Sequence, residues 1–372
     1  MKKTTFSFIL TCLAACSAWA QSKEEALAEF DWLTGYIQRN YPGYEHKTKD
    51  SEKEWNEWVE DKRKAISLQP DTVVTCMDEY VRKFNDGHMY LRMTNEGMAA
   101  FNDVLQRLRA QQAPHTGKSY SMYYTAKAMD DSTYFLRIPS FGNDMSNKLV
   151  RDNWDSITSR PYLIVDLRSN GGGNDEHFSE LMRLVYSKPY WRHGVELYAT
   201  PDFLSLYRRI AAEDADKEWA GWYTEMADSV EKHLGGYVLR PGLQRKILVS
   251  QDTVYTNPRK IGILIHGRNA SSAEQFILEA KESDKVTLFG NENTRGVIDL
   301  SNVYDITSPK GWFKLAIPTT RSCRLPEISI DGIGISPQIP VPYEESLQEK
   351  DNIGEEIKYM ERVLRGMEST TR

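Results

Sequence analysis

The residue with the clearest chemical potential is Ser271, a serine that opens a helical pattern. The stretch NASSAEQF places Glu274 three residues later, which is the spacing of a capping box at a helix N-terminus. A serine in that position also lies among backbone N–H groups that can stabilise an oxyanion. Ser271 therefore has two interpretations, a helix cap and a nucleophile, and the local sequence does not separate them.

A nucleophilic serine needs a base to react at neutral pH. Among the histidines, His88 stands where we expect a helix to end at Gly87 and the alternating strand MYLRM to begin. An isolated histidine most often has a structural role. His177 and His266 lie nearer in the sequence to the strand ends described below, so they remain the alternative bases.

A triple glycine, residues 171–173, follows the apolar run PYLIVDL. It lacks both the G-x-G-x-x-G spacing and the Gly-Lys-Ser/Thr ending of phosphate-binding loops. Glycines here form a simple turn, or they let backbone N–H groups approach a ligand closely. One such N–H, with that of the residue after a nucleophile, makes an oxyanion hole. We expect Gly172 and Ser272 to supply these donors.

The segments around these residues repeat one scheme of strand, loop and helix. PYLIVDL and KIGILIH are continuous apolar runs typical of buried parallel strands, and KVTLFG is the next strand. Two more strands are expected around a polar turn at 129–132. The pattern predicts an α/β fold with a βαβ-type core and a largely parallel or mixed sheet. Sites in such sheets form at the carboxyl ends of strands, where the glycines and Ser271 fall.

The chain divides into four parts by pattern. Apolar residues at helical spacing predict an N-terminal helical subdomain that ends in the His88 strand. The aromatic-rich insertion in the core has three interpretations: it covers a site, it lines a groove, or it is a helical pair with an ordinary apolar face. The expected ranges are 21–115 for the helical subdomain, 116–345 for the core, 190–240 for the helical insertion and 346–372 for a final amphipathic helix.

The first twenty residues have the layout of a signal peptide. Two lysines precede a short apolar core, and Ala18-Trp19-Ala20 offers a small-x-small cleavage site. The core is too short to span a bilayer. Residues 13–16 also resemble a bacterial lipobox, which would place a lipid on Cys16. We favour cleavage after Ala20, and both routes predict export to the periplasm or to an outer-membrane-associated location.

Composition excludes some partners and leaves others open. The net charge of −6 comes without a basic stripe, which argues against a nucleic-acid partner. Cys76 and Cys323 are the cysteines left after the signal, and they either pair or remain separate buried thiols. Their wide spacing gives no zinc pattern, and we expect no metal or cofactor. The oligomeric state stays open.

Several motifs together resemble those of one known protein family. YLIVDLRSNGGGN, the stretch ILIHGRNASSAEQF and IDGIGISPQIPV resemble the serine-peptidase family of tail-specific (C-terminal-processing) proteases and the tricorn core. FLRIPSFG and DGHMYL also fit, so the similarity covers about 75–345. The resemblance implies a ClpP/crotonase-like core, a peptide or unfolded protein as substrate, and Ser271 as the nucleophile. Many members carry a PDZ domain, for which this chain has no room before the core.

The family resemblance implies one of two bases. One variant uses a lysine after the LFG strand, but here Arg295 occupies that region, and arginine does not give up its proton. The tricorn-like variant uses a histidine, which DGHMYL matches at His88. It also implies a carboxylate at Asp331, where the family more often has glutamate, and Glu327 is the alternative. That carboxylate would fix the histidine tautomer.

These features together predict an exported serine-type endopeptidase. The competing class is a non-catalytic peptide-binding or scaffold protein on the same fold, which has no need of both Ser271 and His88. An esterase would differ only in its leaving group, and the G-x-S-x-G elbow of the α/β-hydrolases is absent.

Overall fold

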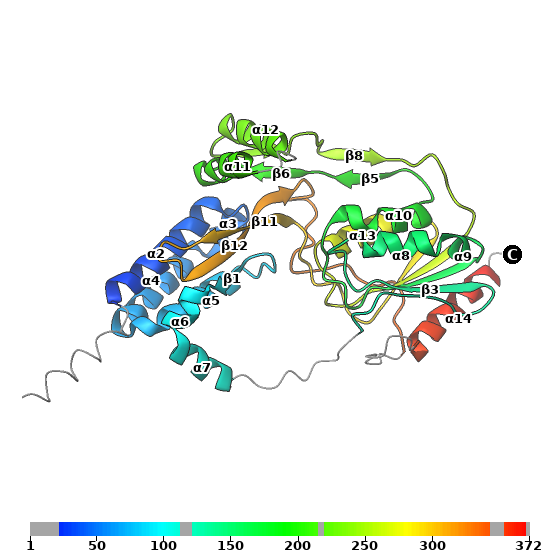
Figure 1. Ribbon diagram of the computed structural model, residues 1–372, viewed down its shortest axis with the longest axis horizontal. Coiled ribbons are helices and arrows are strands. Elements are labelled where there is room, and N and C mark those ends of the chain that lie inside the picture. The colour runs from blue at the N-terminus through cyan, green and yellow to red at the C-terminus, as the bar shows by residue number, and fades with distance from the viewer. Residues whose placement is uncertain (1–21, 112–120, 215–218, 343–352, 370–372) are drawn as a thin grey trace, which may run out of the picture. The chain divides into compact units, whose positions relative to one another are not determined.

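The structure is a computed structural model that describes residues 22–111, 121–214, 219–342 and 353–369 (Figure 1). The predicted signal peptide and Cys16 lie outside these residues. The described chain forms two compact units, each treated by itself below. The first unit contains the described residues of Met1–Pro114, Tyr198–Tyr237 and Asn302–Thr320. The second unit contains those of His115–Leu197, Val238–Ser301 and Arg321–Arg372.

The second unit is built on a five-stranded sheet of order β10-β9-β4-β3-β2. Its first four members run parallel, and β2 pairs with β3 in the antiparallel sense. The predicted mixed α/β core is confirmed, because the continuous apolar runs are its central strands. Their bounds are β2 Thr125–Ala128, β3 Thr133–Arg137, β4 Tyr162–Asp166, β9 Lys260–Leu264 and β10 Val286–Phe289.

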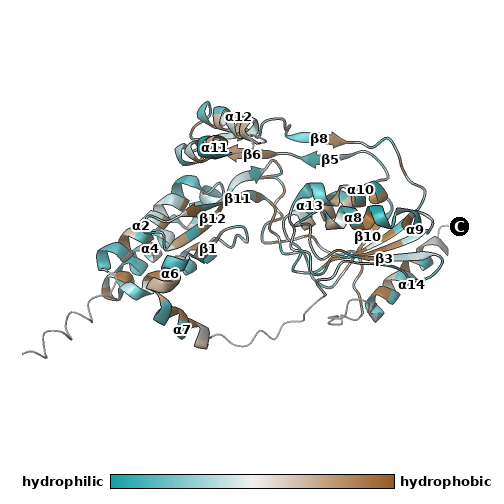
Figure 2. Cartoon of the chain, viewed as in Figure 1, coloured by the Kyte–Doolittle hydropathy of each residue, from teal (hydrophilic) through white to brown (hydrophobic). Residues whose placement is uncertain are grey.

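Helices cover both faces of this sheet, so alternate strand residues are buried on opposite sides. Leu163 and Val165 of β4 pack with α8, α10 and α13, whereas Ile164 packs with α14. Figure 1 shows these helices on the two sides of the sheet, and Figure 2 shows hydrophobic residues concentrated on the strands. The helices are α8 Met145–Asp152, α9 Trp154–Thr158, η3 Asp175–Phe178, α10 Ser179–Val185, α13 Ser272–Ala280 and α14 Glu355–Ser369.

Two further sheets involve strands that the sequence patterns did not single out, apart from β1. One has the order β1-β12-β6-β7 with β11 paired to β12, and the other consists of β5 and β8. The chain passes between the two units within β6, β7, β11 and β12. The bounds are β1 Tyr90–Met93, β5 Tyr190–His193, β6 Val195–Tyr198, β7 Tyr237–Leu239, β8 Lys246–Val249, β11 Leu300–Thr307 and β12 Phe313–Ser322.

The first unit contains the expected N-terminal helical region. Aromatic side chains join its helices, and the rings of Trp55 and Phe84 lie 4.7 Å apart between centroids. Buried Phe30 and Tyr80 extend this contact. The helices are α2 Lys23–Asn40, α3 Tyr44–Thr48, η1 Lys49–Ser51, α4 Glu52–Leu68, η2 Pro70–Thr72, α5 Val73–Lys83, α6 Asn95–Ala100, α7 Asn102–Gln111, α11 Pro201–Glu213 and α12 Ala220–Glu231.

One predicted helix end is wrong. Helix α5 ends at Lys83, four residues before Gly87. The residue with left-handed backbone after it is Asn85, with φ 47°, and not the glycine. Asparagine tolerates this conformation because its short polar side chain can hydrogen-bond locally. The result is a longer connection between α5 and β1, which contains His88.

The compact units group the chain differently from the ranges expected along the sequence. Residues 198–237 and 302–320 belong with the N-terminal helices, although both lie inside the expected core range. The expected domain boundaries therefore stay a prediction. Cys76 lies in the first unit and Cys323 in the second, and each is a buried free thiol. Across the described ranges, no helix has the length and apolar character needed to cross a membrane.

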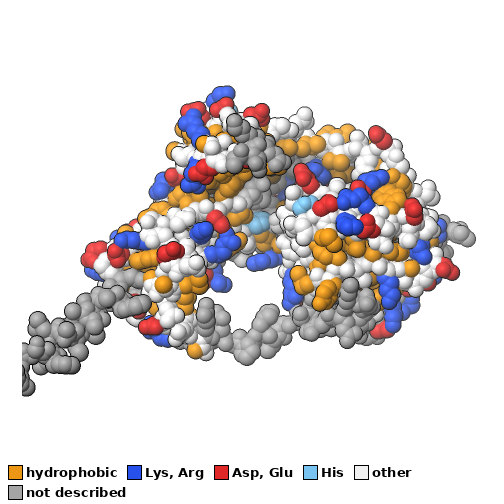
Figure 3. Space-filling view, viewed as in Figure 1, with side chains coloured by type: hydrophobic (Ala, Val, Ile, Leu, Met, Phe, Trp, Pro, Cys, Tyr) orange, Lys and Arg blue, Asp and Glu red, His pale blue; other side chains and the backbone are white. Residues whose placement is uncertain are grey.

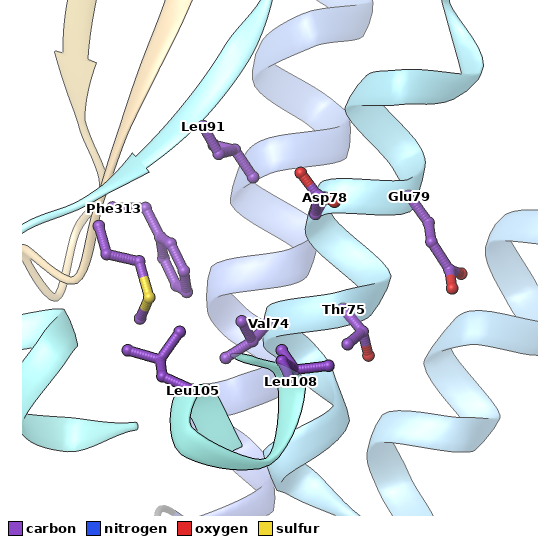
Figure 4. A pocket seen from close by; sticks show the side chains of 9 residues that line it. Val74, Thr75, Asp78, Glu79, Leu91, Leu105, Leu108 and Phe313 are labelled. Atoms are coloured by element: carbon purple, nitrogen blue, oxygen red, sulfur yellow. The ribbon is translucent and has the colours of Figure 1, made fainter. Parts of the chain in front are cut away.

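A pocket of about 460 Å³ lies within the first unit (Figure 4). Its wall is mainly apolar, and Asp78 and Glu79 stand on one side, where they pair with Arg82 and Lys62. None of the candidate catalytic residues lines it. The labelled residues are Val74, Thr75, Asp78, Glu79, Leu91, Leu105, Leu108 and Phe313.

Charged side chains of both signs are intermingled on the face shown in Figure 3. This agrees with the modest net charge of −6.

Candidate active site

Ser271 occupies a strained turn between a buried strand and a helix. It follows β9 and is the N-cap residue of α13, with φ 57° and ψ −128°. An N-cap residue ordinarily has extended backbone, and a side chain at positive φ costs about 1–3 kcal/mol. The capping box is present, and the Ser271 N–H donates to Glu274 Oε2 at 3.2 Å. The cap interpretation is therefore correct, but it does not account for the strained backbone.

Gly172 packs directly against this turn. Its φ is 102°, and a Cβ added to it would lie 2.8 Å from Ser271 Cβ and 2.6 Å from the carbonyl oxygen of Ala270. Only glycine fits at this distance, so the glycine loop after β4 and the serine after β9 meet as the sheet topology predicts. The Gly172 N–H donates to Asn170 Oδ1 at 2.9 Å.

Ser272 joins the glycine loop to helix α13. Its buried hydroxyl donates to the carbonyl oxygen of Gly173 at 3.1 Å. Its backbone N–H is in the first turn of α13, where no earlier helical carbonyl can accept it. The helix dipole makes this end favourable for a negative charge. Ser271, Ser272 and Gly172 are thus brought together.

Two buried asparagines, Asn170 and Asn269, were not identified from the sequence. The Asn269 side chain donates to the carbonyl oxygens of Leu167 at 2.6 Å and Asn170 at 2.9 Å. Asn170 in turn donates to the carbonyl oxygen of Ile138 at 3.1 Å. The loops after β3, β4 and β9 are therefore linked through side-chain amides. Asparagines four or five residues after the ends of the two apolar strands were the available signal.

Glu274 holds a segment that runs beside Ser271. Its carboxylate is fully buried and accepts hydrogen bonds from the Thr294 hydroxyl and from the N–H groups of Gly296 and Val297. Burial raises the pKa of Glu274, while these donors act in the opposite direction. Arg295, in the same segment, has an exposed side chain, and its N–H donates to the Asn269 carbonyl at 2.8 Å.

Asp331 is half-buried and binds the two residues that follow the segment 294–297. Its Oδ1 accepts the N–H groups of Ile298 and Asp299, each at 2.7 Å. Ile298 follows Val297, whose carbonyl oxygen accepts the Ser271 N–H at 2.8 Å. One short segment therefore contacts both Ser271 and Asp331. The alternative acid, Glu327, is exposed.

His88 belongs to the first unit, whereas the other candidate residues belong to the second. It is half-buried in the connection between α5 and β1. Its backbone N–H donates to Asp86 Oδ1 at 2.8 Å. The Tyr41 hydroxyl donates to Asp86 Oδ2 at 2.6 Å, so a buried carboxylate fixes the turn that contains the histidine.

The alternative histidines both hold loops of the second unit. His177 Nδ1 lies 2.7 Å from the carbonyl oxygen of Phe141 and can donate to it. His266 Nδ1 accepts the Arg268 N–H at 3.2 Å, and its Nε2 lies 3.5 Å from Glu292 Oε2. These contacts give each ring a structural role.

No group of three or more His, Cys, Asp or Glu residues that could hold a metal ion occurs in the part of the chain that the structure describes.

The family model of peptidase family S41 matches residues 132–341, which is more than half of the chain. The chain belongs to peptidase family S41. This membership makes it a peptidase of the serine class, with peptides or proteins as substrates. The resemblance inferred from the glycine and serine motifs is confirmed.

Two solved structures with TM-scores above 0.5 share the fold of this S41 peptidase. Mature CPAF in complex with lactacystin matches with a TM-score of 0.58 and 12% identity, over 93% of this chain and 98% of that one. A candidate peptidase from Parabacteroides merdae matches with a TM-score of 0.56 and 13% identity, over 87% and 90%. The photosystem II D1 C-terminal processing protease has a TM-score of 0.45 and 11% identity, over 93% and 98%. A comparison with curated proteins finds no match.

Proposed function

We propose that this S41 peptidase is an exported serine endopeptidase that acts through an acyl-enzyme intermediate. The Ser271 hydroxyl attacks the carbonyl carbon of a peptide bond while His88 takes its proton. His88 then gives that proton to the leaving amine, and a water molecule hydrolyses the ester with the same base. The substrate is a peptide or an unfolded protein.

The observation that carries this proposal is the backbone of Ser271, with φ 57° and ψ −128°. A helix cap needs no such conformation. A sharp, strained strand-to-helix turn is how other hydrolase folds expose a nucleophilic serine, and strain of this kind concentrates at functional sites. The close packing of Gly172 against Ser271 supports the same role.

The oxyanion donors in this proposal are the N–H groups of Ser272 and Gly172. The first lies at the favourable end of α13, and the second lies beside the serine. Because the Gly172 N–H donates to Asn170 Oδ1, a substrate oxygen would share or replace that acceptor.

Asp331 is the proposed partner of His88, with Glu327 as the alternative. Two backbone N–H groups anchor Asp331 Oδ1, so the carboxylate has a fixed orientation. An oriented carboxylate holds a histidine in the required tautomer and stabilises the imidazolium. The Glu327 side chain is exposed, so the orientation of its carboxylate is less restricted.

Export and the domain ranges complete the proposal. The mature chain begins at Gln21 after signal cleavage, or at a lipid-modified Cys16. The ranges expected from the sequence are kept as part of the proposal: 21–115 for the helical subdomain, 116–345 for the catalytic core with its insertion at 190–240, and 346–372 for the part that contains the final helix. The intact mass of the protein recovered from its native compartment distinguishes the two N-termini.

The test is digestion of a denatured protein, with the fragments analysed by mass spectrometry. The wild type should produce internal cleavages, and both Ser271→Ala and His88→Ala should produce none above background. Release of terminal residues alone would contradict the endopeptidase assignment. Retention of the substrate without cleavage by the wild type would instead favour the non-catalytic peptide-binding alternative.

A further inference from the structure

We propose that Glu274 is a positioning residue for the reaction, in addition to being part of a helix cap. Its carboxylate fixes residues 294–297 against Ser271 and so holds the serine in its strained backbone conformation. This inference rests on the proposed role of Ser271 as the nucleophile.

The Glu274 carboxylate makes more contacts than a capping box requires. Oε1 accepts the Thr294 hydroxyl at 2.5 Å and the Gly296 N–H at 2.7 Å. Oε2 accepts the Val297 N–H at 2.7 Å and the Ser271 N–H at 3.2 Å. A capping box needs only one return bond, from the glutamate to the cap residue. The other bonds all go to residues 294–297.

Residues 294–297 hold the serine in return. The Val297 carbonyl oxygen accepts the Ser271 N–H at 2.8 Å, and the Arg295 N–H donates to the carbonyl oxygen of Asn269 at 2.8 Å. Ser271, Glu274 and Val297 therefore form a closed ring of hydrogen bonds. A residue in a sparsely populated backbone conformation stays there only when its surroundings fix it from several sides.

The four partners of Glu274 require a side chain in which both terminal atoms accept hydrogen bonds. Each presents a hydrogen, so a carboxylate can accept all of them, whereas an amide must turn its NH₂ group toward two of them. Glu274→Gln is nearly isosteric but breaks the ring of bonds. The Ser271 backbone then relaxes, which moves both its Oγ and the adjacent Ser272 N–H. A misplacement of about 1 Å in a reacting group can lower a rate by about 100-fold.

Glu279 offers a matched control on the same helix. It is also a buried carboxylate, and it accepts hydrogen bonds from Tyr190, Arg192 and Gln275, none of which belongs to residues 294–297. Glu279→Gln therefore removes a buried charge from α13 without touching the ring around Ser271.

The experiment measures the second-order rate of Ser271 labelling by a fluorophosphonate probe, per mole of folded protein as judged by circular dichroism. Glu274→Gln should label about 100-fold more slowly than the wild type. Glu279→Gln should label within about threefold of the wild type, even if its melting temperature falls equally. Thr294→Val, which removes one donor, should label about tenfold more slowly and serves if Glu274→Gln does not fold.

The inference is overturned if folded Glu274→Gln labels within threefold of the wild-type rate. If Glu274→Gln does not fold, the same result in Thr294→Val overturns it. An equal loss of rate in Glu279→Gln also overturns it, because the effect would then be one of general stability. If the wild type itself fails to label at Ser271, the proposed function fails and the inference with it. Labelling of the wild type but not of Ser271→Ala shows that the proposed nucleophile stands, whatever the Glu274 variants do.

Discussion

Asp299 and Asp331 each bind the backbone of the other. Asp331 Oδ1 accepts the Asp299 N–H at 2.7 Å, and Asp299 Oδ2 accepts the Asp331 N–H at 2.8 Å. Arg324 donates to Asp299 Oδ1 at 3.0 Å and balances the charge of this buried carboxylate. The reciprocal pair fixes the loop that contains the proposed third catalytic residue.

This arrangement leads to a prediction for the catalytic acid. Asp331→Asn keeps an oxygen that can accept both N–H groups, so the loop should stay folded, but the charge that stabilises a histidine cation is lost. We expect a fall in kcat of up to about 10⁴-fold with a small change in melting temperature. Glu327→Gln, at an exposed position, should change kcat far less. Steady-state kinetics of both variants give the ranking, and the opposite ranking would transfer the role to Glu327.

The proposed base gives a second prediction. His88→Ala should lower kcat by about 10³-fold or more, because the serine then lacks a proton acceptor. The fold should survive, since the His88 contact with Asp86 uses the backbone N–H, which alanine retains. Circular dichroism and kinetics on the same preparation check both parts. Near wild-type turnover would mean that the base is elsewhere, and His266→Ala and His177→Ala would be the next variants.

The contact between Gly172 and Ser271 gives a third prediction. Gly172→Ala places a Cβ 2.6 Å from the Ala270 carbonyl oxygen, so it should both destabilise the second unit and abolish most activity. Gly242 is a matched control in the same unit, because its φ is also positive, 77°, yet a Cβ there meets open space. Gly242→Ala should cost about 1–2 kcal/mol of stability for its left-handed backbone and leave kcat unchanged. Equal activity in the two variants would argue against the close approach.

Asp166 gives a prediction for stability at low pH. Burial alone would raise the pKa of this carboxyl, but Arg168 and Arg137 hold it at about 2, below its ordinary value of 3.8. The ionised form is favoured in the folded state, so its contribution is present above about pH 4 and is lost as the pH falls toward 2. The contribution is about 2 kcal/mol.

Melting temperatures at pH 4 and pH 2.5 check this pH dependence. The wild type should lose stability over this interval, and Asp166→Asn should be less stable at pH 4 but lose less on acidification. Asp144→Asn is the control, since Asp144 forms an exposed pair with Arg151 that salt should screen. An unchanged slope in Asp166→Asn would show that other carboxyls control the acid response.

The sequence predicted the core of the fold because its strands are buried on both faces. PYLIVDL and KIGILIH are apolar without alternation, and the structure places them as adjacent parallel strands β4 and β9. The topological rule for such sheets then predicted that the loops after them would meet. Ser271 and Gly172 do so.

The geometry within those loops could not be predicted from sequence patterns. The backbone of Ser271 depends on long-range bonds to Val297 and Glu274, and a capping-box pattern looks the same with either backbone conformation. Asn170 and Asn269 act through side-chain amides that meet only in the folded sheet. The early end of α5 was missed because Asn85, rather than the glycine, adopts the left-handed conformation.

The central claim is that Ser271 is a nucleophile, and covalent labelling tests it most directly. The purified protein is treated with a fluorophosphonate and digested, and the adduct is mapped by mass spectrometry. We predict one adduct, on Ser271, which is lost in Ser271→Ala and kept in Ser272→Ala, because the proposed catalytic contribution of residue 272 is its backbone N–H, although this variant also loses the hydroxyl contact with Gly173. Ser271→Ala should also melt within a few degrees of the wild type, since losing a helix cap costs about 1 kcal/mol of stability. Its kcat should fall on the order of 10⁶-fold, because the nucleophile is lost. An adduct on another serine, or full activity in Ser271→Ala, would contradict the claim and leave helix capping as the whole role of Ser271.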